Sequence, residues 1–347
     1  MRCPFRMTGA LRIGCSSWTS NAWLGKVYPE AIRHEDRLAA YASLFNAVEI
    51  DATYHRPPNP FVMEGWKAKT PANFRFALKL TRDYVDPRKP VDGARLAYFT
   101  EAAKLLGEKL GPILLQFAPW VKPGRASTFL YALLDELDPS LRYAVEFRDP
   151  GWYSGETGQS LIEALSTRDV ALVWSCRPNV AVPPALTSDF VYLRFAGDLH
   201  TIPREEHGEI RLDRTTETRV WASRLKSRLS EVQEAFVLFN DDFAGFAPHS
   251  ADLFRRELES APLRYQAEIS EPLMGASAFT SDVGTATLVQ PAAPASRWAR
   301  PLPKLPAPGL PGAVTGGPAR RPVAVCGRLP LPRSRRVRGK GDSVGVF

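Results

Sequence analysis

The stretch Val145-Glu146-Phe147-Arg148 alternates large apolar side chains with charged ones. Because successive side chains of a β-strand point to opposite faces, Glu146 and Arg148 would share one face. Five further segments close in the same way, with a short apolar run that ends on polar residues: Val48-Glu49-Ile50-Asp51, Phe76-Ala77-Leu78-Lys79, Leu114-Leu115-Gln116, Tyr192-Leu193-Arg194 and Leu238-Phe239-Asn240. An ordinary buried strand would place these charges in a core at high cost. A parallel barrel accommodates them, because its strands end in a polar mouth where active sites lie.

Strand-like and helix-like segments alternate along most of the chain. We expect strands at residues 11–15, 47–51, 74–80, 112–117, 143–147, 170–174, 190–195 and 235–240. Helical spacing predicts helices at residues 35–45, 61–69, 94–109, 126–137, 159–167, 216–229 and 248–259. Only a short Pro-rich stretch, residues 177–188, joins the sixth and seventh strands, which predicts one abbreviated crossover.

This order of segments predicts an α/β fold of the (β/α)8 TIM-barrel type, because a strand and a helix alternate about eight times over a length typical of such barrels. The rival is an open, doubly wound parallel sheet. Such a sheet usually has fewer strands, and no Gly-x-Gly-x-x-Gly motif follows the first strand here. We therefore favour the barrel.

The composition changes beyond about residue 276. The last 72 residues hold 11 of the 31 prolines, and they hold 11 Lys and Arg against 2 Asp and Glu. Hydrophobic periodicity is lost there, so this segment cannot bury enough apolar surface to offset the entropy of ordering it. We expect a barrel domain over residues 1–262 and a disordered Pro/Arg-rich tail over residues 263–347.

The charge distribution and the apolar runs limit the possible partners. Residues 1–275 hold 34 basic and 35 acidic residues, so the net charge of +8 comes from the tail. We therefore expect nucleic acid to bind only weakly and nonspecifically, through the tail. No apolar run approaches the length of a membrane span, no signal pattern opens the chain, and the four cysteines form no CxxC pair. These features predict a cytoplasmic protein with no membrane association.

Several short motifs follow one another along the chain, and their residues and order form one recognisable pattern. They are Ile13-Gly14-Cys15-Ser16-Ser17-Trp18 with Tyr28-Pro29, residues 45–54, Thr70-Pro71 with residues 74–79, residues 106–117, residues 144–148 with Trp152, residues 191–194, and residues 239–242 with Gly245. Together they resemble the YecE-like family, also called domain of unknown function 72, from about residue 11 to about residue 255. The resemblance implies a single-domain TIM barrel and adds little about a reaction.

The chain departs from the family pattern at the seventh strand. The family usually has Arg-Leu-His-Gly there, whereas this chain has Arg194-Phe195-Ala196-Gly197. The family's Asn-Asn-Asp corresponds to residues 240–242, which read Asn-Asp-Asp. The missing histidine argues against a mechanism in this chain that uses that imidazole, and His55 and His200 are the candidates to replace it.

The strand-end residues suggest a ligand site. If the strand ends converge, the mouth holds anions at Glu49, Asp51 and Glu146, cations at Lys79, Arg148 and Arg194, and amides at Gln116 and Asn240. Two carboxylates in different surroundings can divide acid and base roles, so we predict Glu146 and Glu49 as catalytic residues. Arginine side chains would hold the anionic part of a ligand. The alternative is a salt-bridge network that closes the barrel, but such a network needs fewer than six polar strand ends.

Aromatic residues follow several of these strands. Trp18 and Tyr54 are predicted to contact the ligand, because aromatic faces beside carboxylates suit sugars and nucleosides; the alternative is packing over the barrel end. No strand-end histidine accompanies the carboxylates, so we predict no metal and no cofactor. Cys15-Ser16 lacks the strand–turn–helix context of a nucleophile elbow.

Three functions remain open from the sequence. The first is an enzyme that acts by acid/base chemistry on a small polar metabolite bearing a sugar, phosphate or carboxylate. The second is a noncatalytic binding or regulatory barrel that holds such a ligand with the same charges. The third is a nucleic-acid-associated protein anchored by the basic tail. The neutral barrel domain argues against the third function, and the missing histidine weakens the first.

Overall fold

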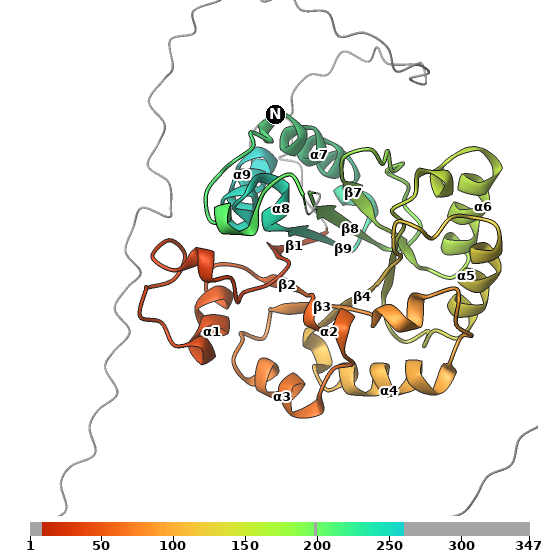
Figure 1. Cartoon of the computed structure of the whole chain (residues 1–347), viewed down its shortest axis with the longest axis horizontal. Helices are drawn as coiled ribbons and strands as arrows, with labels where there is room; N and C mark the ends of the chain where they lie inside the picture. Colours follow the sequence, from red (N-terminus) through yellow and green to blue (C-terminus); the bar gives the residue numbers. More distant parts are fainter. Residues whose placement is uncertain (1–8, 198–199, 260–347) are drawn as a thin grey trace, which may run out of the picture. The chain divides into compact units, whose positions relative to one another are not determined.

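Parallel β-strands form a nearly closed barrel with helices around it (Figure 1). The computed structural model describes residues 9–197 and 200–259, and over these residues the barrel has nine strands. They are Ala10–Cys15 (β1), Ala47–Ile50 (β2), Arg75–Lys79 (β3), Leu110–Gln116 (β4), Tyr143–Glu146 (β5), Ala171–Leu172 (β6), Trp174–Cys176 (β7), Phe190–Phe195 (β8) and Glu234–Phe239 (β9). Their order in the sheet is β6-β5-β4-β3-β2-β1-β9-β8-β7. This arrangement confirms the predicted TIM-type barrel.

The ninth strand arises because the predicted sixth strand is interrupted at Val173. β6 pairs with β5, whereas β7 pairs with β8. Between them, the Val173 N–H donates to the Val145 carbonyl at 3.0 Å. β6 and β7 are therefore two halves of one strand that changes its pairing partner. Because β6 is the first strand in the sheet order and β7 the last, this strand connects the two edges of the sheet.

Helices separate most of the strands. They are Arg37–Ala42 (α1), Ala52–His55 (α2), Pro60–Ala68 (α3), Gly93–Lys104 (α4), Arg125–Asp135 (α5), Gly155–Ser166 (α6), Thr215–Arg228 (α7), Asp241–Ala244 (α8) and Ala247–Glu259 (α9). Local chemistry sets where helices begin. The Asn59 side chain accepts from the Phe61 N–H ahead of Pro60, and the Asp92 side chain accepts from the Arg95 N–H. Both are N-caps that satisfy a free backbone donor in the first turn.

Several predicted boundaries differ from the structure. The helix predicted at residues 35–45 is a 3-10 turn, His34–Asp36, followed by the short α1. The helix predicted at residues 94–109 ends at Lys104, because Gly107 takes a left-handed φ of 57° in the turn before β4. The single-turn helices α2 and α8 were not predicted; they begin directly after β2 and β9. The abbreviated crossover is confirmed, since no helix lies between Cys176 and Phe190 in this described segment.

Side-chain alternation along the strands separates two hydrophobic clusters. The cluster inside the barrel contains Ala47, Ala77, Leu114, Ala144, Ala171, Val173, Phe190, Tyr192, Phe236 and Leu238. Their neighbours in sequence, such as Val48, Leu115 and Val145, belong to the larger cluster that also includes buried residues of the helices. The predicted split of each strand into two faces is therefore confirmed, and the inward face is the one that carries the strand-end polar residues.

The amino-terminal ends of the strands carry an ion cluster of their own. Glu234 at the start of β9 accepts from Arg12 Nε at 2.5 Å and from Arg142 Nη1 at 2.6 Å. Gly14 permits the close approach of β1 and β2 above this cluster, because a Cβ there would lie 1.8 Å from the Ala47 carbonyl oxygen. Residues at this end of a TIM barrel serve stability.

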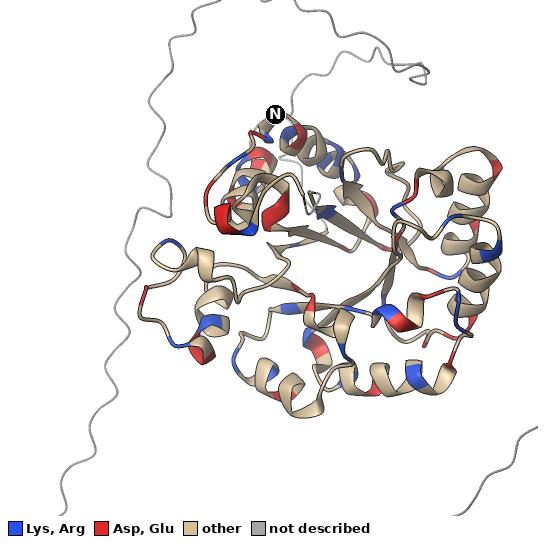
Figure 2. Cartoon of the chain, viewed as in Figure 1, with Lys and Arg blue, Asp and Glu red and all other residues tan. Residues whose placement is uncertain are grey.

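Figure 2 shows acidic and basic residues interspersed over the helices. In the described residues no helix is long and apolar enough to cross a membrane. The predicted domain boundary at residue 262 and the tail over residues 263–347 lie outside the described residues.

Candidate functional site

The strand register brings the predicted polar residues to one end of the barrel. Gln116 at the end of β4 pairs with Glu146 at the end of β5, and Ser175 in β7 pairs with Arg194 in β8. Glu49 in β2 occupies the same inward face, two residues after Ala47 of the inner hydrophobic cluster. The polar residues therefore form a layer directly above that cluster, at the carboxyl ends of the strands.

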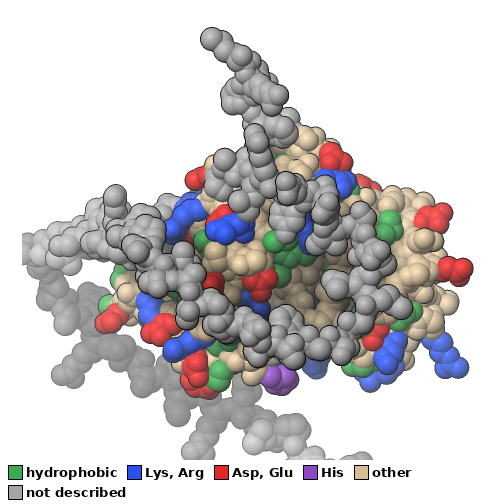
Figure 3. All heavy atoms as spheres, turned by 90° about the horizontal axis from the view of Figure 1, so that it is seen from above, with side chains coloured by type: hydrophobic (Ala, Val, Ile, Leu, Met, Phe, Trp, Pro, Cys, Tyr) green, Lys and Arg blue, Asp and Glu red, His purple; other side chains and the backbone are tan. Residues whose placement is uncertain are grey.

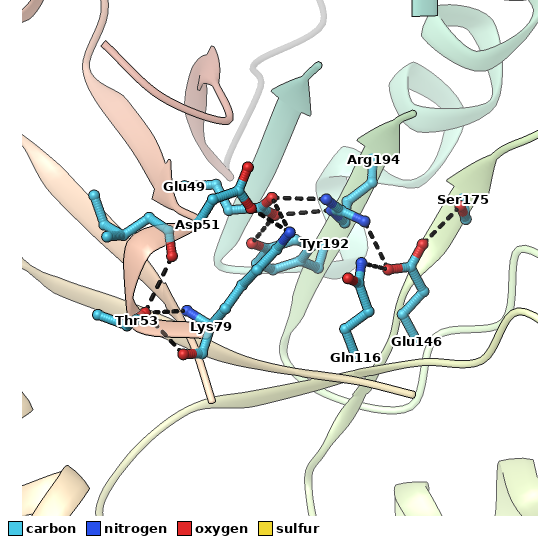
Figure 4. Close-up of polar contacts among 10 residues, drawn as sticks. Glu49, Asp51, Thr53, Lys79, Gln116, Glu146, Ser175, Tyr192 and Arg194 are labelled. Atoms are coloured by element: carbon cyan, nitrogen blue, oxygen red, sulfur yellow. Dashed lines mark hydrogen bonds and ion pairs between the residues drawn. The ribbon is translucent and has the colours of Figure 1, made fainter. Parts of the chain in front are cut away.

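Arg194 lies at the centre of this layer and bridges two carboxylates across the barrel (Figure 4). Its Nε donates to Glu49 Oε2 at 2.8 Å, and its Nη2 donates to Glu49 Oε1 at 2.7 Å. Its Nη1 donates to Glu146 Oε2 at 2.6 Å. Neither glutamate has any exposed surface, and Arg194 is 2% exposed. The guanidinium thus links β8 to both β2 and β5.

The remaining hydrogen-bonding positions of the two carboxylates are also occupied. Glu146 Oε2 accepts a very short bond from Gln116 Nε2, and Glu146 Oε1 accepts from Ser175 Oγ at 3.1 Å. The Tyr192 hydroxyl donates to Glu49 Oε2 at 2.8 Å. Buried charges are tolerated when they are both paired and hydrogen-bonded, and both glutamates meet that condition.

Lys79 links the buried polar residues in the barrel interior to partly exposed residues at its edge. Its Nζ lies 3.4 Å from Glu49 Oε1 and forms an ion pair with Asp51, whose side chain is 42% exposed. Its backbone is held by Thr53 of α2, whose hydroxyl accepts from the Lys79 N–H at 3.0 Å. The Tyr54 ring centroid lies 5.9 Å from Nζ. Asp51 and Tyr54 therefore form the part of the cluster nearest to solvent.

These contacts determine the protonation states. Burial alone would raise the pKa of both glutamates, but the nearby cations outweigh it. Arg194 and Lys79 hold the pKa of Glu49 well below its ordinary value, and Arg194 and Arg148 lower the pKa of Glu146 to about 2. Burial and the adjacent Glu49 carboxylate raise the pKa of Tyr192. At neutral pH both carboxylates are therefore ionised acceptors and Tyr192 is a donor.

Three predicted site residues lie outside this contact network. Arg148, two residues beyond Glu146, is half-buried, and its Nε is buried without a hydrogen-bond partner among the described residues. Asn240 caps α8, with its side chain accepting from the Asp242 N–H at 2.7 Å. Trp18 belongs to the outer hydrophobic cluster, where its ring meets Trp66 edge-on at 5.1 Å.

The structure adds two members that the sequence did not predict. Tyr192 precedes Arg194 by two residues in β8, so strand alternation could have placed it on the inward face. Ser175 was missed because the sixth strand carries no charged residue at its end and is interrupted at Val173. Both hydroxyls donate to the paired glutamates.

A histidine other than His55 and His200 also lies at this end of the barrel. His207 lines a cavity of about 270 Å³ at the ends of β1 and β9, together with Asn240 and Asp242. His55 and His200 are exposed. In residues 9–197 and 200–259, no group of three or more His, Cys, Asp or Glu side chains is placed to hold a metal ion.

Comparison with known proteins relates this barrel to proteins of the same fold. The chain is 22% identical over 280 residues to the UPF0759 protein YunF of Bacillus subtilis (strain 168), covering 73% of this chain and 95% of that protein. A DUF72 family protein from Thermotoga maritima MSB8 matches with a TM-score of 0.62 at 24% identity, over 72% of this chain and 100% of that chain. A DUF72 family protein from Enterococcus faecalis V583 matches with a TM-score of 0.59 at 21% identity, over 74% of this chain and 100% of that chain. At this identity the structural likeness shows the fold alone.

A family model extends the relationship to the sequence. The model, described as "Protein of unknown function DUF72", matches residues 12–272, which include every strand of the described barrel except the first two residues of β1. That span is well over half of the chain. The protein therefore belongs to the DUF72 family.

Proposed function

We propose that the protein binds a small anionic metabolite, bearing a phosphate or carboxylate, at the carboxyl end of the barrel. The observation that carries this proposal is the state of Arg148. Its Nε is shielded from solvent and has no hydrogen-bond partner among the described residues. A buried guanidinium N–H without an acceptor is costly, and an anionic ligand would supply the acceptor.

The neighbouring carboxylate is poorly placed to satisfy Arg148. Glu146 already accepts from Arg194, Gln116 and Ser175. The charge of Arg148 lowers the pKa of Glu146, as does that of Arg177 on the adjacent strand end, so positive charge gathers on this side of the mouth. Figure 3 shows one face of the molecule on which acidic and basic side chains lie beside a hollow.

An acid/base role for Glu146 or Glu49 would require the ligand to change the pairing of that glutamate. A paired carboxylate whose pKa is held low is a weak base, and it carries no proton to donate at neutral pH. Chemistry at these residues would require the ligand anion to draw Arg194 away from one of them. Saturation of both carboxylates in the free protein favours the second candidate, a noncatalytic ligand-binding barrel.

The binding proposal is tested by calorimetric titration with inorganic phosphate and with a set of small phosphate and carboxylate metabolites. Arg148→Met should weaken binding about 10- to 100-fold, because a charge-assisted hydrogen bond contributes about 1.5–3 kcal/mol. Arg142→Met is the matched control. It makes the same change six residues earlier, directly before β5 and at the opposite end of the barrel.

Two outcomes would contradict the proposal. One is that no anion binds to the full chain. The other is that Arg142→Met weakens binding as much as Arg148→Met, which would place the anion elsewhere. Turnover of a bound metabolite, lost in Glu146→Gln while binding persists, would decide between the enzyme and the noncatalytic barrel.

A further inference from the structure

A separate polar cavity lies at the carboxyl ends of β1 and β9. Its volume is about 270 Å³, and none of its lining residues belongs to the polar cluster formed by Arg194, Glu49, Glu146 and their hydrogen-bonding partners. Cys15 pairs with Phe239, so Ser16 and Asn240 follow at the same level on adjacent strand ends. Both side chains line the cavity, with His207 and Asp242 from the segments that follow β8 and β9.

Ser16 is the residue that points to a ligand. It is 7% exposed, and its Oγ is shielded from solvent with no hydrogen-bond partner among the described residues. The Ser16 N–H donates to the Phe239 carbonyl at 2.8 Å, so the backbone holds the side chain in place. An unsatisfied buried hydroxyl destabilises a fold, and a ligand hydroxyl in the cavity would remove that cost.

A histidine and a carboxylate complete the lining. His207 Nε2 lies 3.3 Å from Asp242 Oδ1, yet it has no aligned hydrogen-bond partner in the described part of the chain. Asp242 is held by its backbone, because its N–H donates to Asn240 Oδ1 and its carbonyl lies against Gly197. The cavity therefore presents an imidazole and a carboxylate in fixed positions.

The charge of the cavity selects the class of ligand. Asp241 is already engaged, because its Oδ1 accepts from the Ala247 N–H at 2.8 Å and from Trp23 Nε1 at 3.2 Å. With Asp242 it gives the lining two carboxylates against the one guanidinium of Arg204, a balance that does not favour a phosphate. A neutral polyol both donates and accepts hydrogen bonds, so it matches the hydroxyl, imidazole and carboxylate that remain.

We propose that this cavity is a subsite for the hydroxyl groups of a sugar or polyol, held by Ser16, His207 and Asp242. The inference rests on the proposed function in one respect, since the anionic end of the same ligand would lie at Arg148. Both places lie at the same end of the barrel, because Arg148 follows the carboxyl end of β5 and the cavity lies at the carboxyl ends of β1 and β9. The ligand class is then a phosphorylated or carboxylated sugar or polyol.

Saturation-transfer NMR on the full chain with neutral probes tests the subsite without an anion. Glycerol, glucose and myo-inositol at millimolar concentration serve as probes, and at least one should receive saturation from the wild-type protein. Ser16→Ala and His207→Gln should each lower the affinity for that probe by about tenfold, the loss expected for one hydrogen bond. His55→Gln is the matched control, because His55 is an exposed histidine outside the cavity lining.

Absence of transfer from all three probes would overturn the subsite, and so would equal transfer in Ser16→Ala and wild type. Ser16→Ala guards against misfolding, since it removes one atom and leaves the backbone bonds in place. Calorimetry with inorganic phosphate reports on Arg148 independently. Polyol binding without phosphate binding would contradict the proposed function and support the subsite. Phosphate binding without polyol binding would support the proposed function and contradict the subsite.

Discussion

Arg194 holds Glu49 in a two-pronged ion pair, with Nε and Nη2 donating to the two carboxylate oxygens at 2.8 and 2.7 Å. The pair ties β8 to β2 across the interior of the barrel, where neither side chain is more than 2% exposed. Such geometry fixes both side chains in one orientation. The third guanidinium nitrogen is then aimed at Glu146 on β5, so a single residue sets the positions of both glutamates.

We expect Arg194→Met to lower the free energy of unfolding by about 3–5 kcal/mol, because it leaves two buried carboxylates without their shared cation. Urea unfolding followed by circular dichroism measures this change. Arg95→Met is the control, since Arg95 pairs with Asp92 at the surface, where such pairs contribute about 0–1 kcal/mol. The triple variant Arg194→Met, Glu49→Gln, Glu146→Gln should recover part of the loss. Equal stability of Arg194→Met and wild type would show that the ion pairs do not support the barrel.

The stability of the wild-type protein should fall as the pH is lowered below about 4. Glu146 has a folded-state pKa of about 2, below the value of about 4.3 expected for the unfolded chain. The unfolded state therefore takes up the proton first, and stability present above pH 4 is lost as the pH approaches 2. Glu146→Gln removes this titration, so its urea midpoint should fall less between pH 5 and pH 3. Parallel pH profiles for the two proteins would contradict the assignment.

Strand alternation was enough to predict that Glu49, Glu146 and Arg194 meet at the barrel mouth. It placed Glu49, Glu146 and Arg194 on inward faces, and the parallel topology brought those faces together. It could not predict their pairing. Whether Arg194 reaches one glutamate or two depends on side-chain orientation and on distances across the barrel, neither of which a periodic pattern contains.

Residues contributed by loops were beyond the reach of the same reasoning. His207 lies between β8 and α7, and its position beside Asp242 depends on how that long connection folds over the barrel. The sequence places His55 after the second predicted strand, and His200 and His207 after the seventh, with nothing to rank them. The interruption at Val173 was equally hidden, because an exchange of pairing partners leaves hydrophobicity unchanged.

The barrel domain should fold without the Pro/Arg-rich segment. A chain that ends at Ser270 keeps nearly all of the residues matched by the family model and removes the segment that lacks periodicity. We expect its melting temperature to stay within a few degrees of the full chain. Its affinity for nucleic acid should fall, because the basic excess lies in the removed residues. A large drop in melting temperature would place the domain boundary elsewhere, and undiminished nucleic-acid binding by the shorter chain would place the nucleic-acid site in the barrel domain.

Gly197→Ala should damage the subsite through the backbone. A Cβ at Gly197 would lie 1.7 Å from the Asp242 carbonyl oxygen, so the start of α8 must shift and carry Asp242 with it. We expect a loss of about 1–3 kcal/mol in unfolding free energy and weaker polyol binding. Gly65→Ala in α3 is the matched control. No atom lies within 4 Å of its added Cβ, so helix propensity should make it neutral or up to about 1 kcal/mol more stable. Urea unfolding and saturation-transfer NMR on both variants measure the contrast, and a Gly197→Ala protein that keeps wild-type stability and polyol binding would show that the close contact does not position Asp242.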